Sequence, residues 1–425
     1  MPNSNTVEIL TIGNELLLGI RTNTHLTYLG KQLSLLGLNV QYCQVIPDDP
    51  KKIQSAIVLA LTRSNLIITT GGLGPTEDDM TRESVAFALG KELIYNDTIF
   101  ESITEYFSKI SRGVSSIHKK QCFQIEGSTI MKNERGTAPG LFVESGSSVV
   151  ALLPGPTHEL IPMFQNQLVP LLKSKSFCAK EANYVQIRSC GIGESSVEEL
   201  IQPIVKEQPS VEVALCVHLG VVDLRLCCPS SELEYSELMQ LAEGCRELLG
   251  DHFVGFGEVS LAEVISNILR KSEQTLAVAE SCTGGLMGNA FTDISGASKV
   301  FKGGVICYAN DVKVLQLSVP EEILEQHGAV SGECAIAMAS GAAENLSADY
   351  GLSITGFAGP EGGDANNPVG TIHIGFYSPF GVWAKSVRYI GGRLDVKARA
   401  VNAALDWMRR ELIYQDKRQR RDCSI

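Results

Sequence analysis

The chain has 425 residues, 44% of them hydrophobic and 20% charged, a composition that supports ordinary packed cores and a length that corresponds to two to four domains. Lys plus Arg total 36 against 48 Asp plus Glu, and the formal net charge of −12 disfavours broad attraction to nucleic acid or anionic lipid. No apolar run reaches the roughly 18 residues of a membrane span, and the first residues lack the features of a signal peptide. We therefore expect a cytoplasmic globular protein with neither nucleic-acid nor membrane partners.

The 12 cysteines are scattered, without a C-x-x-C pair or the Cys/His spacing of a zinc site. We expect them to be reduced and mostly buried. The only dense basic run is "DKRQRR", at 416–421. We expect residues 416–425 to form a solvated tail rather than a nucleic-acid patch.

From Val7 onward, short β-rich segments alternate with segments of helical periodicity, as in "VEILTIG", "THLTYLGKQLSLLG", "LNVQYCQVI" and "LIITTGG". This alternation is typical of right-handed βαβ units, in which helices cover both faces of a parallel sheet. Residues 1–172 are therefore predicted to form a doubly wound, mostly parallel α/β domain. Its ligands should collect at the carboxyl ends of the strands.

Two further domains are predicted. Residues 178–252 read as a small α+β domain, with a strand and helix in "YVQIRSCGIGESSVEELIQPIV", two strands in "VEVALCVHLGVVDLRLCC" and a final helix that ends near Leu249. Residues 258–415 alternate helices with strands such as "TLAVAES", "GGVICYAN" and "YGLSITGFAG", and 371–390 reads as a hairpin. The third domain is therefore predicted to be an α/β sandwich.

The segment "LIITTGGLGPTEDDMTRES" places Gly71, Gly72 and Gly74 between a buried strand and a helix. Such glycines let backbone N–H groups approach a phosphate closely. The acids that follow them would repel a bare phosphate unless a divalent cation lies between the two. Asp48 and Asp49, at the end of another predicted strand, are expected at the same edge. We favour a metal-bridged phosphate site over a helix start whose acids only complement the helix dipole, and its metal ligands would be Asp48, Asp78 and Asp79.

The segment "TLAVAESCTGGLMG", 275–288, sets Ser281, Cys282 and Thr283 between a strand and a helix whose first N–H groups can hold an oxyanion. Strand alternation points Cys282 to the core, and Thr283 is expected to cap the helix or contact a ligand. Serine needs a neighbouring base. Because none of the seven histidines lies in the glycine-rich motifs of this domain, a Ser–His–Asp triad is not favoured.

In "GGVICYANDVKVL", Tyr308 ends a predicted strand and Lys313 stands in the first turn of a helix. A desolvated lysine can act as a base, and a tyrosine hydroxyl can relay its proton. Spacing alone does not distinguish a Ser–Lys–Tyr set from a solvated lysine and a tyrosine that lies in the core or at its rim.

Several motifs resemble those of a known family. "GNELLLG", "VIPDD", "TTGGLGPTEDDMT" and "GTAPG" resemble, in this order, the molybdopterin-binding fold at the start of the CinA family of competence/damage-inducible proteins. The middle region is similar to the KH-like connector of that family. "AESCTGGL", "KGGVICYANDVK" and "GFAGPEGG…NPVGT" resemble its C-terminal domain. The resemblance covers nearly the whole chain and implies a homodimer.

For the first domain, the resemblance implies metal-dependent hydrolysis of ADP-ribose and, in more distant relatives, handling of molybdopterin. It makes Asp48 and Asp79 the functional carboxylates. The residues that it implies near the ligand are Glu15, Asn23 and Thr76, with the loop glycines. One departure is Pro156-Thr157, where the family pattern has a variable residue followed by proline. This departure is expected to reshape the lip of the pocket.

For the third domain, the resemblance implies deamidation of nicotinamide mononucleotide without a metal, with Ser281 as the nucleophile and Tyr308 and Lys313 assisting. The substrate contacts that it implies are Thr283, Gly284, Gly359, Gly362, Arg393 and Lys397. Lys397 stands where the family has arginine, and it keeps the charge but not the bidentate fork. The alternative is a binding protein for molybdopterin or a nucleotide, with degenerate active sites.

Overall fold

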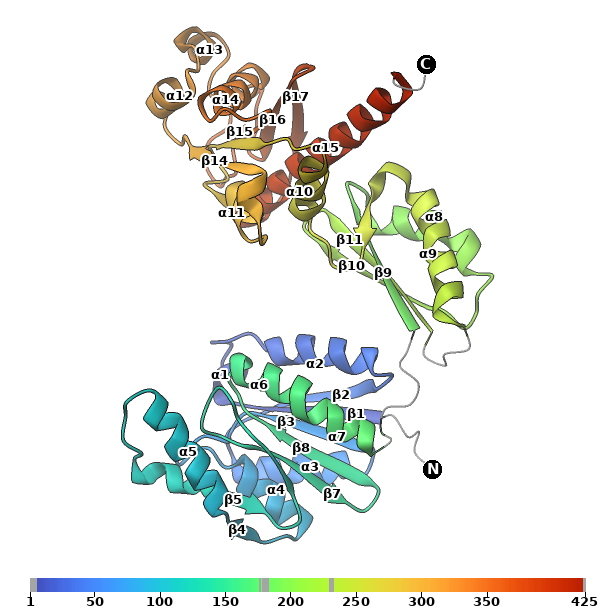
Figure 1. Cartoon of the computed structure of the whole chain (residues 1–425), viewed down its shortest axis with the longest axis vertical. Coiled ribbons are helices and arrows are strands. Elements are labelled where there is room, and N and C mark those ends of the chain that lie inside the picture. Colours follow the sequence, from blue (N-terminus) through green and yellow to red (C-terminus); the bar gives the residue numbers. More distant parts are fainter. Residues whose placement is uncertain (1–5, 176, 178–182, 229–232, 423–425) are drawn as a thin grey trace. The chain divides into compact units, whose positions relative to one another are not determined.

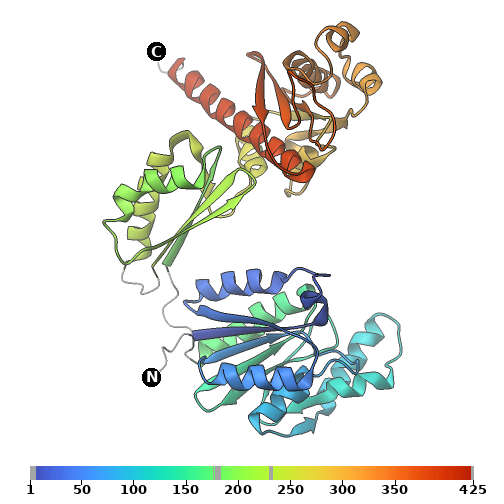
Figure 2. The same cartoon turned by 180° about the vertical axis from the view of Figure 1, so that it is seen from behind.

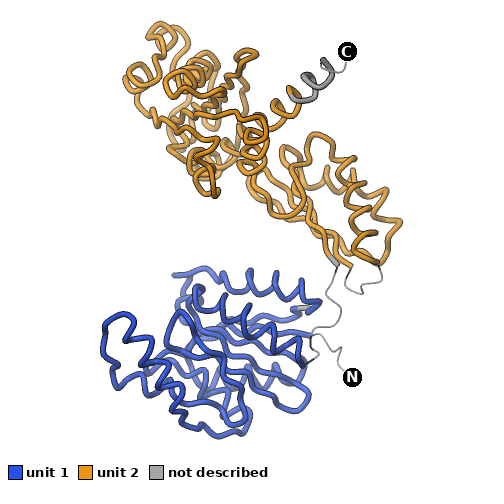
Figure 3. Tube along the Cα trace, viewed as in Figure 1, with its two compact units in different colours: residues 1–183, 229–231 blue, residues 184–228, 232–425 orange. Residues whose placement is uncertain are grey.

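The computed structural model describes residues 6–175, 177, 183–228 and 233–422, without the side chains of 416–422 (Figure 1). The chain divides into two compact units, each described by itself (Figure 3). Unit 1 comprises 1–183 with 229–231, and unit 2 comprises 184–228 with 232–425. No helix in these described ranges is long and apolar enough to cross a bilayer.

A six-stranded sheet in the order β2-β1-β3-β8-β7-β6 forms the centre of unit 1. The parallel strands are β1 (Thr6–Ile12), β2 (Asn39–Ile46), β3 (Leu66–Thr70) and β8 (Ser148–Leu153). The antiparallel edge consists of β7 (Gly140–Ser145) and β6 (Thr129–Met131). Every residue of β1, β3 and β8 is buried, as expected for parallel strands covered on both faces.

Helices cover both faces of this sheet, as the alternation predicted. Val7 and Ile9 of β1 pack into the cluster of α2 (Thr24–Leu35), α6 (Thr157–Met163) and α7 (Val169–Ser174). Leu10 and Ile12 belong to the cluster of α3 (Pro50–Leu61) and α4 (Thr81–Leu89) on the opposite face. The remaining elements are α1 (Asn14–Leu17), α5 (Asp97–Lys109), the 3-10 helix η1 (Ser116–Cys122), the π-helix η2 (Phe164–Leu168) and the two-stranded sheet of β4 (Leu93–Tyr95) and β5 (Phe123–Ile125).

Unit 2 begins with the small α+β domain. Its sheet has the order β10-β11-β9-β12, with β9 (Asn183–Cys190), β10 (Glu212–His218), β11 (Val221–Cys228) and β12 (Phe253–Phe256). Helices α8 (Glu194–Val205) and α9 (Tyr235–Leu249) share one hydrophobic core with the sheet. The predicted order of strands and helices is confirmed.

The rest of unit 2 is built on a five-stranded sheet in the order β14-β13-β15-β16-β17 (Figure 2). The parallel strands are β13 (Leu276–Glu280), β14 (Phe301–Ile306) and β15 (Tyr350–Gly356), and the predicted hairpin is β16 (Thr371–Ser378) with β17 (Gly381–Arg388). One hydrophobic cluster joins the sheet to α10 (Leu261–Lys271), α11 (Leu286–Thr292) and α15 (Arg393–Asp422). A second cluster joins it to α12 (Asn310–Leu317), α13 (Glu321–Gln326) and α14 (Gly332–Asn345).

Helix α15 ties the two parts of unit 2 together. Buried Arg409 pairs with Asp406 at 2.7 Å and donates to the carbonyl oxygens of Phe253 and Asp251 at 2.8 and 2.6 Å. Arg410 donates to Cys190 O at 3.0 Å. Helix α15 also continues through residue 422, so residues 416–422 of the expected tail have a helical backbone; their side chains, and residues 423–425, lie outside the described residues.

Candidate functional sites

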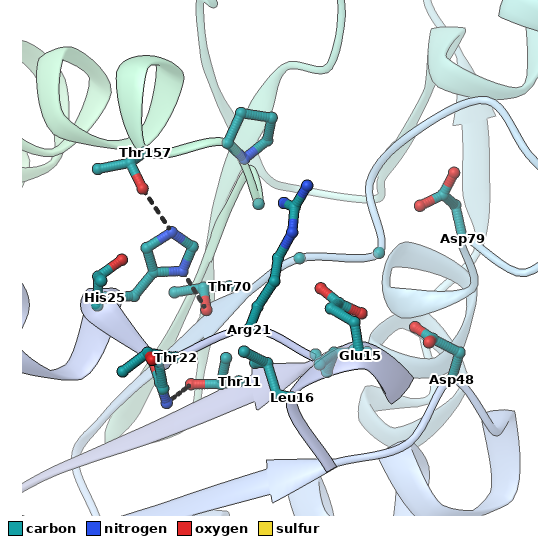
Figure 4. A pocket seen from close by; sticks show the side chains of 18 of the residues that line it. Thr11, Glu15, Leu16, Arg21, Thr22, His25, Asp48, Thr70, Asp79 and Thr157 are labelled. Atoms are coloured by element: carbon teal, nitrogen blue, oxygen red, sulfur yellow. Dashed lines mark hydrogen bonds between the residues drawn. The ribbon is translucent and has the colours of Figure 1, made fainter. Parts of the chain in front are cut away.

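In unit 1, a cleft of about 360 Å³ opens where the parallel strands end (Figure 4). Each of four strands is followed by a residue that lines the cleft: Gly13 after β1, Asp48 after β2, Gly71 after β3 and Gly155 after β8. The carboxyl edge of the parallel strands is therefore the ligand edge, as the general rule for such sheets predicts.

One end of the cleft is acidic, with Glu15, Asp48, Asp78 and Asp79 in its wall. Oδ2 of Asp48 accepts a hydrogen bond from the N–H of Asn14 at 2.8 Å. Partial burial raises the pKa of Asp48, and the charges of the other three acids raise it further. These carboxylates therefore lie close enough to repel one another, which favours a cation at this end.

Two of the predicted loop residues, Thr76 and Gly74, lie against the side chain of Asp79 and do not line the cleft. The N–H and hydroxyl of Thr76 donate to Oδ2 of Asp79 at 2.9 and 2.5 Å. A Cβ atom on Gly74 would stand 2.4 Å from the same oxygen. Gly71, at φ +96°, does line the cleft, and a Cβ there would meet Ile12 O at 2.3 Å. Gly72 also lines it.

The acidic loop is held from outside by η1, a contact that the sequence analysis did not predict. Nζ of Lys120 donates to Thr76 O at 2.6 Å and to Glu77 O at 3.4 Å. The pKa of Asp78 is lowered, first by the side chain of Thr76 and also by the charge of Lys120. Asp49, which follows Asp48, does not line the cleft: its side chain caps α3 and accepts from Lys52 N at 3.0 Å.

The donor chemistry of the acidic end fits a divalent cation. Among the described residues, no three His, Cys, Asp or Glu side chains form a ready-made metal cluster. Magnesium commonly binds through one or two carboxylates and completes its coordination with phosphate oxygens and water. A cleft wall with separate carboxylates is therefore compatible with a cation that arrives together with a phosphorylated ligand.

The other end of the cleft is uncharged, and the sequence analysis missed its main residue, His25. Its Nδ1 lies 3.3 Å from Oγ1 of Thr70, and its Nε2 lies 3.3 Å from Oγ1 of Thr157 (Figure 4). Burial lowers the pKa of His25, with partial opposition from the charge of Glu15. Thr157 belongs to the Pro156-Thr157 departure, and both of these residues line the cleft.

Asn23 and Arg21 complete the cleft wall. Oδ1 of Asn23 caps α2 by accepting from Leu26 N at 3.2 Å, and its Nδ2 donates to Oγ1 of Thr11 at 3.1 Å. The exposed side chain of Arg21 projects between the acidic end and His25 (Figure 4). Its guanidinium adds a positive charge near the middle of the cleft.

In unit 2, Ser281 directly follows β13 and is 8% exposed, with its N–H bonded to Ile354 O at 2.9 Å. Lys313 is 1% exposed, and its Nζ donates to Cys307 O at 3.0 Å and Tyr308 O at 3.3 Å. Cys307 N in turn bonds to Glu280 O at 2.8 Å. Ser281 thus follows β13, and the amine of Lys313 is bonded to the backbone that follows the neighbouring strand β14. Within the described chain, no hydrogen bond joins them directly.

Glu280 organises the turn that follows Ser281. Its carboxylate is 2% exposed and accepts hydrogen bonds from the N–H groups of Gly285, Met287 and Gly288 at 3.1, 3.0 and 2.8 Å. The free N–H groups at the start of α11 are therefore occupied by this side chain, a role that the sequence analysis missed. An acid directly before a glycine-rich helix start was the available signal.

The turn itself keeps unoccupied donors. In the described part of the chain, no acceptor lies on the backbone N–H of Thr283 or Gly284, and Oγ1 of Thr283 is buried without a hydrogen-bond partner. Cys282 lies in the hydrophobic core, as strand alternation predicted, and burial raises its pKa to about 11. The thiol is therefore uncharged near neutral pH, and this disfavours it as the nucleophile.

Arg393 connects three of the predicted loops. Its Nη1 donates to Gly359 O at 2.7 Å, and its Nη2 donates to the hydroxyl of Tyr308 at 3.2 Å. Lys397 lies near the Ser281 turn, since a Cβ on Gly284 would stand 3.8 Å from its Nζ. Gly362 has φ +91°, and a Cβ there would stand 2.9 Å from the ring of Phe357. The turn therefore requires glycine at this position. Two cations thus flank the turn that carries Ser281.

The fold and these two strand-edge sites define a multidomain α/β protein with a molybdopterin-binding-like first domain, a KH-like middle domain and an α/β C-terminal domain. Family models match accordingly: the probable molybdopterin binding domain at residues 8–174, the damage-inducible protein CinA KH domain at 186–255 and the CinA C-terminal domain at 258–412. The chain belongs to the CinA family.

Individual relatives agree. The chain is 40% identical over 408 residues to a CinA-like protein of Dictyoglomus thermophilum, which covers 96% of this chain and 99% of the relative. It is 41% identical over 409 residues to a putative competence-damage inducible protein of Thermoanaerobacter pseudethanolicus, with 96% and 98% covered. A crystal structure of the competence/damage inducible protein CihA from Agrobacterium tumefaciens is 38% identical and covers 35% of this chain and 91% of that chain, with a TM-score of 0.34.

Proposed function

We propose that the chain is a pyridine-nucleotide salvage hydrolase whose C-terminal domain converts nicotinamide mononucleotide to nicotinate mononucleotide and ammonia. The observation that carries this proposal is the turn after β13, which holds Ser281 and unoccupied N–H donors, while buried Lys313 of α12 is bonded to the backbone that follows the neighbouring strand β14. The family resemblance supplies the substrate. Arg393 and Lys397 supply positive charge of the kind that a nucleotide phosphate requires.

In this proposal, Oγ of Ser281 attacks the carboxamide carbon while the amine of Lys313 takes its proton. The N–H groups of Thr283 and Gly284 receive the oxyanion of the tetrahedral intermediate. Lys313 returns the proton to the departing nitrogen, and ammonia leaves as the carbon–nitrogen bond breaks. Water then hydrolyses the ester on Ser281, which releases the carboxylate product and restores the hydroxyl. Tyr308 would assist the proton transfer.

For unit 1, we propose metal-assisted hydrolysis of the diphosphate bond of ADP-ribose, which yields AMP and ribose 5-phosphate. One or two carboxylates of the set Asp48, Asp78 and Asp79 would hold a divalent cation that neutralises phosphate charge, because no three of the described acids form a metal cluster. Arg21 would approach the same phosphates from the middle of the cleft. The support is the convergence of these carboxylates with the glycine loop at one cleft end.

The experiment that tests both activities is incubation of the full chain with nicotinamide mononucleotide and, separately, with ADP-ribose, each with and without Mg²⁺. We expect ammonia release that is independent of Mg²⁺ and ADP-ribose cleavage that requires it. Ligand-induced thermal stabilisation without turnover at either site would instead favour the alternative, a binding protein with degenerate sites.

A further inference from the structure

We infer that His25 and Thr157 are specificity-determining residues of the unit 1 cleft, and that they recognise the uncharged, hydroxyl-bearing half of a ligand whose phosphate half lies at the acidic end. This inference rests on the proposed phosphate-ester function of the cleft. It goes beyond that function because it assigns the second half of the ligand to a distinct part of the wall.

The cleft is divided by charge. Its carboxylates lie at one end, while His25 and the threonine hydroxyls lie at the other, with Arg21 between them (Figure 4). Threonine hydroxyls line the cleft on the side of His25: Thr11, Thr22, Thr70 and Thr157 (Figure 4). Among the described residues, no carboxylate cluster lies there to compete for a cation, and a wall of neutral donors and acceptors suits sugar hydroxyls or an uncharged heterocycle.

The imidazole of His25 is held at both nitrogens. Oγ1 of buried Thr70 lies 3.3 Å from Nδ1, and Oγ1 of Thr157 lies 3.3 Å from Nε2. A neutral imidazole has one donor and one acceptor nitrogen, and a hydroxyl can fill either role. The ring orientation is therefore fixed by two contacts, one of which is to a buried strand residue. Such a ring can serve as a preorganised wall for a ligand.

Thr157 is the exposed end of this chain of hydrogen bonds. After the contact to Nε2 of His25, its hydroxyl retains hydrogen-bonding capacity toward the cleft. The contact joins positions 132 residues apart. We call the hydrogen-bonded pair of His25 and Thr157 the recognition element. The position at which the chain departs from the family pattern thus carries a hydroxyl that His25 orients.

The ligand that fits both ends joins a phosphate or diphosphate to an uncharged group rich in hydroxyl functions. A ligand with phosphates alone would use only the acidic end and Arg21. The two halves can therefore be separated experimentally with a matched pair of probes, the α,β-methylene analogue of ADP-ribose and methylenediphosphonate, neither of which has a hydrolysable P–O–P bond.

The test is calorimetric titration of the full chain with each probe in the presence of Mg²⁺. Thr157→Val keeps the side-chain shape and removes the hydroxyl, and His25→Phe removes both ring nitrogens. Thr157→Val removes a neutral hydrogen bond to the ligand, and His25→Phe removes the contact that orients Thr157, so binding of the ADP-ribose analogue should weaken about 5- to 10-fold in each variant. Binding of methylenediphosphonate should remain unchanged. The matched control is His158→Phe, which changes the neighbouring exposed histidine outside the cleft lining.

Equal weakening of both probes, or unchanged binding of the ADP-ribose analogue in Thr157→Val, would overturn the inference. Thr157 is exposed, so this variant is expected to fold even where His25→Phe does not. A wild-type chain that binds the analogue but does not cleave ADP-ribose would refute the proposed hydrolysis and leave the recognition element in place. A wild-type chain that binds methylenediphosphonate but not the analogue would refute the recognition element.

Discussion

Both sites lie at the carboxyl ends of parallel strands, but their charged side chains differ in burial. In unit 1, the carboxylates line an open cleft, where partial burial and then the charges of Glu15, Asp78 and Asp79 raise the pKa of Asp48. In unit 2, the carboxylate of Glu280 and the amine of Lys313 are buried and bonded to the backbone. Charge in the first site remains available to a ligand. In the second site, the buried carboxylate of Glu280 supports the turn that presents the hydroxyl of Ser281, and the cations that flank this turn are the less buried Arg393 and Lys397.

The sharpest test of this contrast is Ser281→Ala, because an uncharged hydroxyl is the proposed reacting group of unit 2. We expect loss of deamidation by about 1,000-fold or more, as for other essential nucleophiles. The measurement is ammonia release from nicotinamide mononucleotide.

Cys282→Ala is the control for Ser281→Ala, since the thiol lies in the core and its pKa is raised to about 11 by burial. This variant should retain deamidation within a few fold. If deamidation persists in Ser281→Ala and disappears in Cys282→Ala, the nucleophile is Cys282 and the proposal for Ser281 is wrong.

In unit 1, Asp48→Asn should lower metal-dependent cleavage of ADP-ribose on the order of 100-fold, because the charge that would hold the cation is lost. Asp49→Asn tests the specificity of this effect. Asparagine caps a helix as well as aspartate does, and Asp49 serves as the cap of α3. Parallel losses in the two variants, measured as initial rates over a Mg²⁺ titration, would contradict the division of roles.

Glu280→Gln addresses the buried charge of unit 2. The amide offers one acceptor oxygen and places an NH₂ group toward backbone N–H donors, so at least one of three hydrogen bonds is lost. The expected cost is about 2–4 kcal/mol of unfolding free energy, since each bond is to a charged group. Chemical denaturation followed by tryptophan fluorescence reports on unit 2, which contains both tryptophans, Trp383 and Trp407. An unchanged midpoint would show that the carboxylate does not support the turn.

The smallest expected effect concerns pH and His25. Its folded-state pKa is lowered by burial, so the unfolded chain binds the proton more readily. The contribution of His25 to stability is therefore fully present above the unfolded pKa of about 6.5 and is lost as the pH falls below it. Calorimetric unfolding of unit 1 near pH 5.5 and near pH 7.5 should show a smaller difference in His25→Phe than in the wild type. A pH-dependent difference in the variant that equals or exceeds that of the wild type would contradict the predicted contribution of His25.

Much of the fold was predictable because local patterns decide it. The run L-I-I-T-T of wholly buried β3 is typical of a parallel strand covered on both faces, whereas β16 is mostly buried and β17 mostly exposed. The strand ends, and with them Asp48, Gly71 and Ser281, follow from the same patterns. The middle domain could be predicted because its helices carry apolar residues at helical spacing, such as Leu238, Ala242, Cys245 and Leu249 of α9, although β10 is almost wholly exposed.

The residues that the sequence did not reveal act through contacts between distant positions. Lys120 reaches a carbonyl 44 positions away, and His25 meets Thr157 across 132 positions. Neither contact has a local periodicity, because each depends on where β8 and η1 are placed by the completed sheet. Glu280 is different: its partners are five to eight residues away, but its burial depends on the packing of α11.

The arginines of α15 have a consequence for how unit 2 melts. Arg409 satisfies the carbonyl oxygens of residues 251 and 253 with a guanidinium that is itself paired with Asp406. If the small domain were to unfold alone, this charged group would lose its backbone partners inside a still-folded neighbour, at a considerable energetic cost. The KH-like domain and the C-terminal domain are thus joined into one cooperative folding unit, and a scanning calorimeter should record a single endotherm for both.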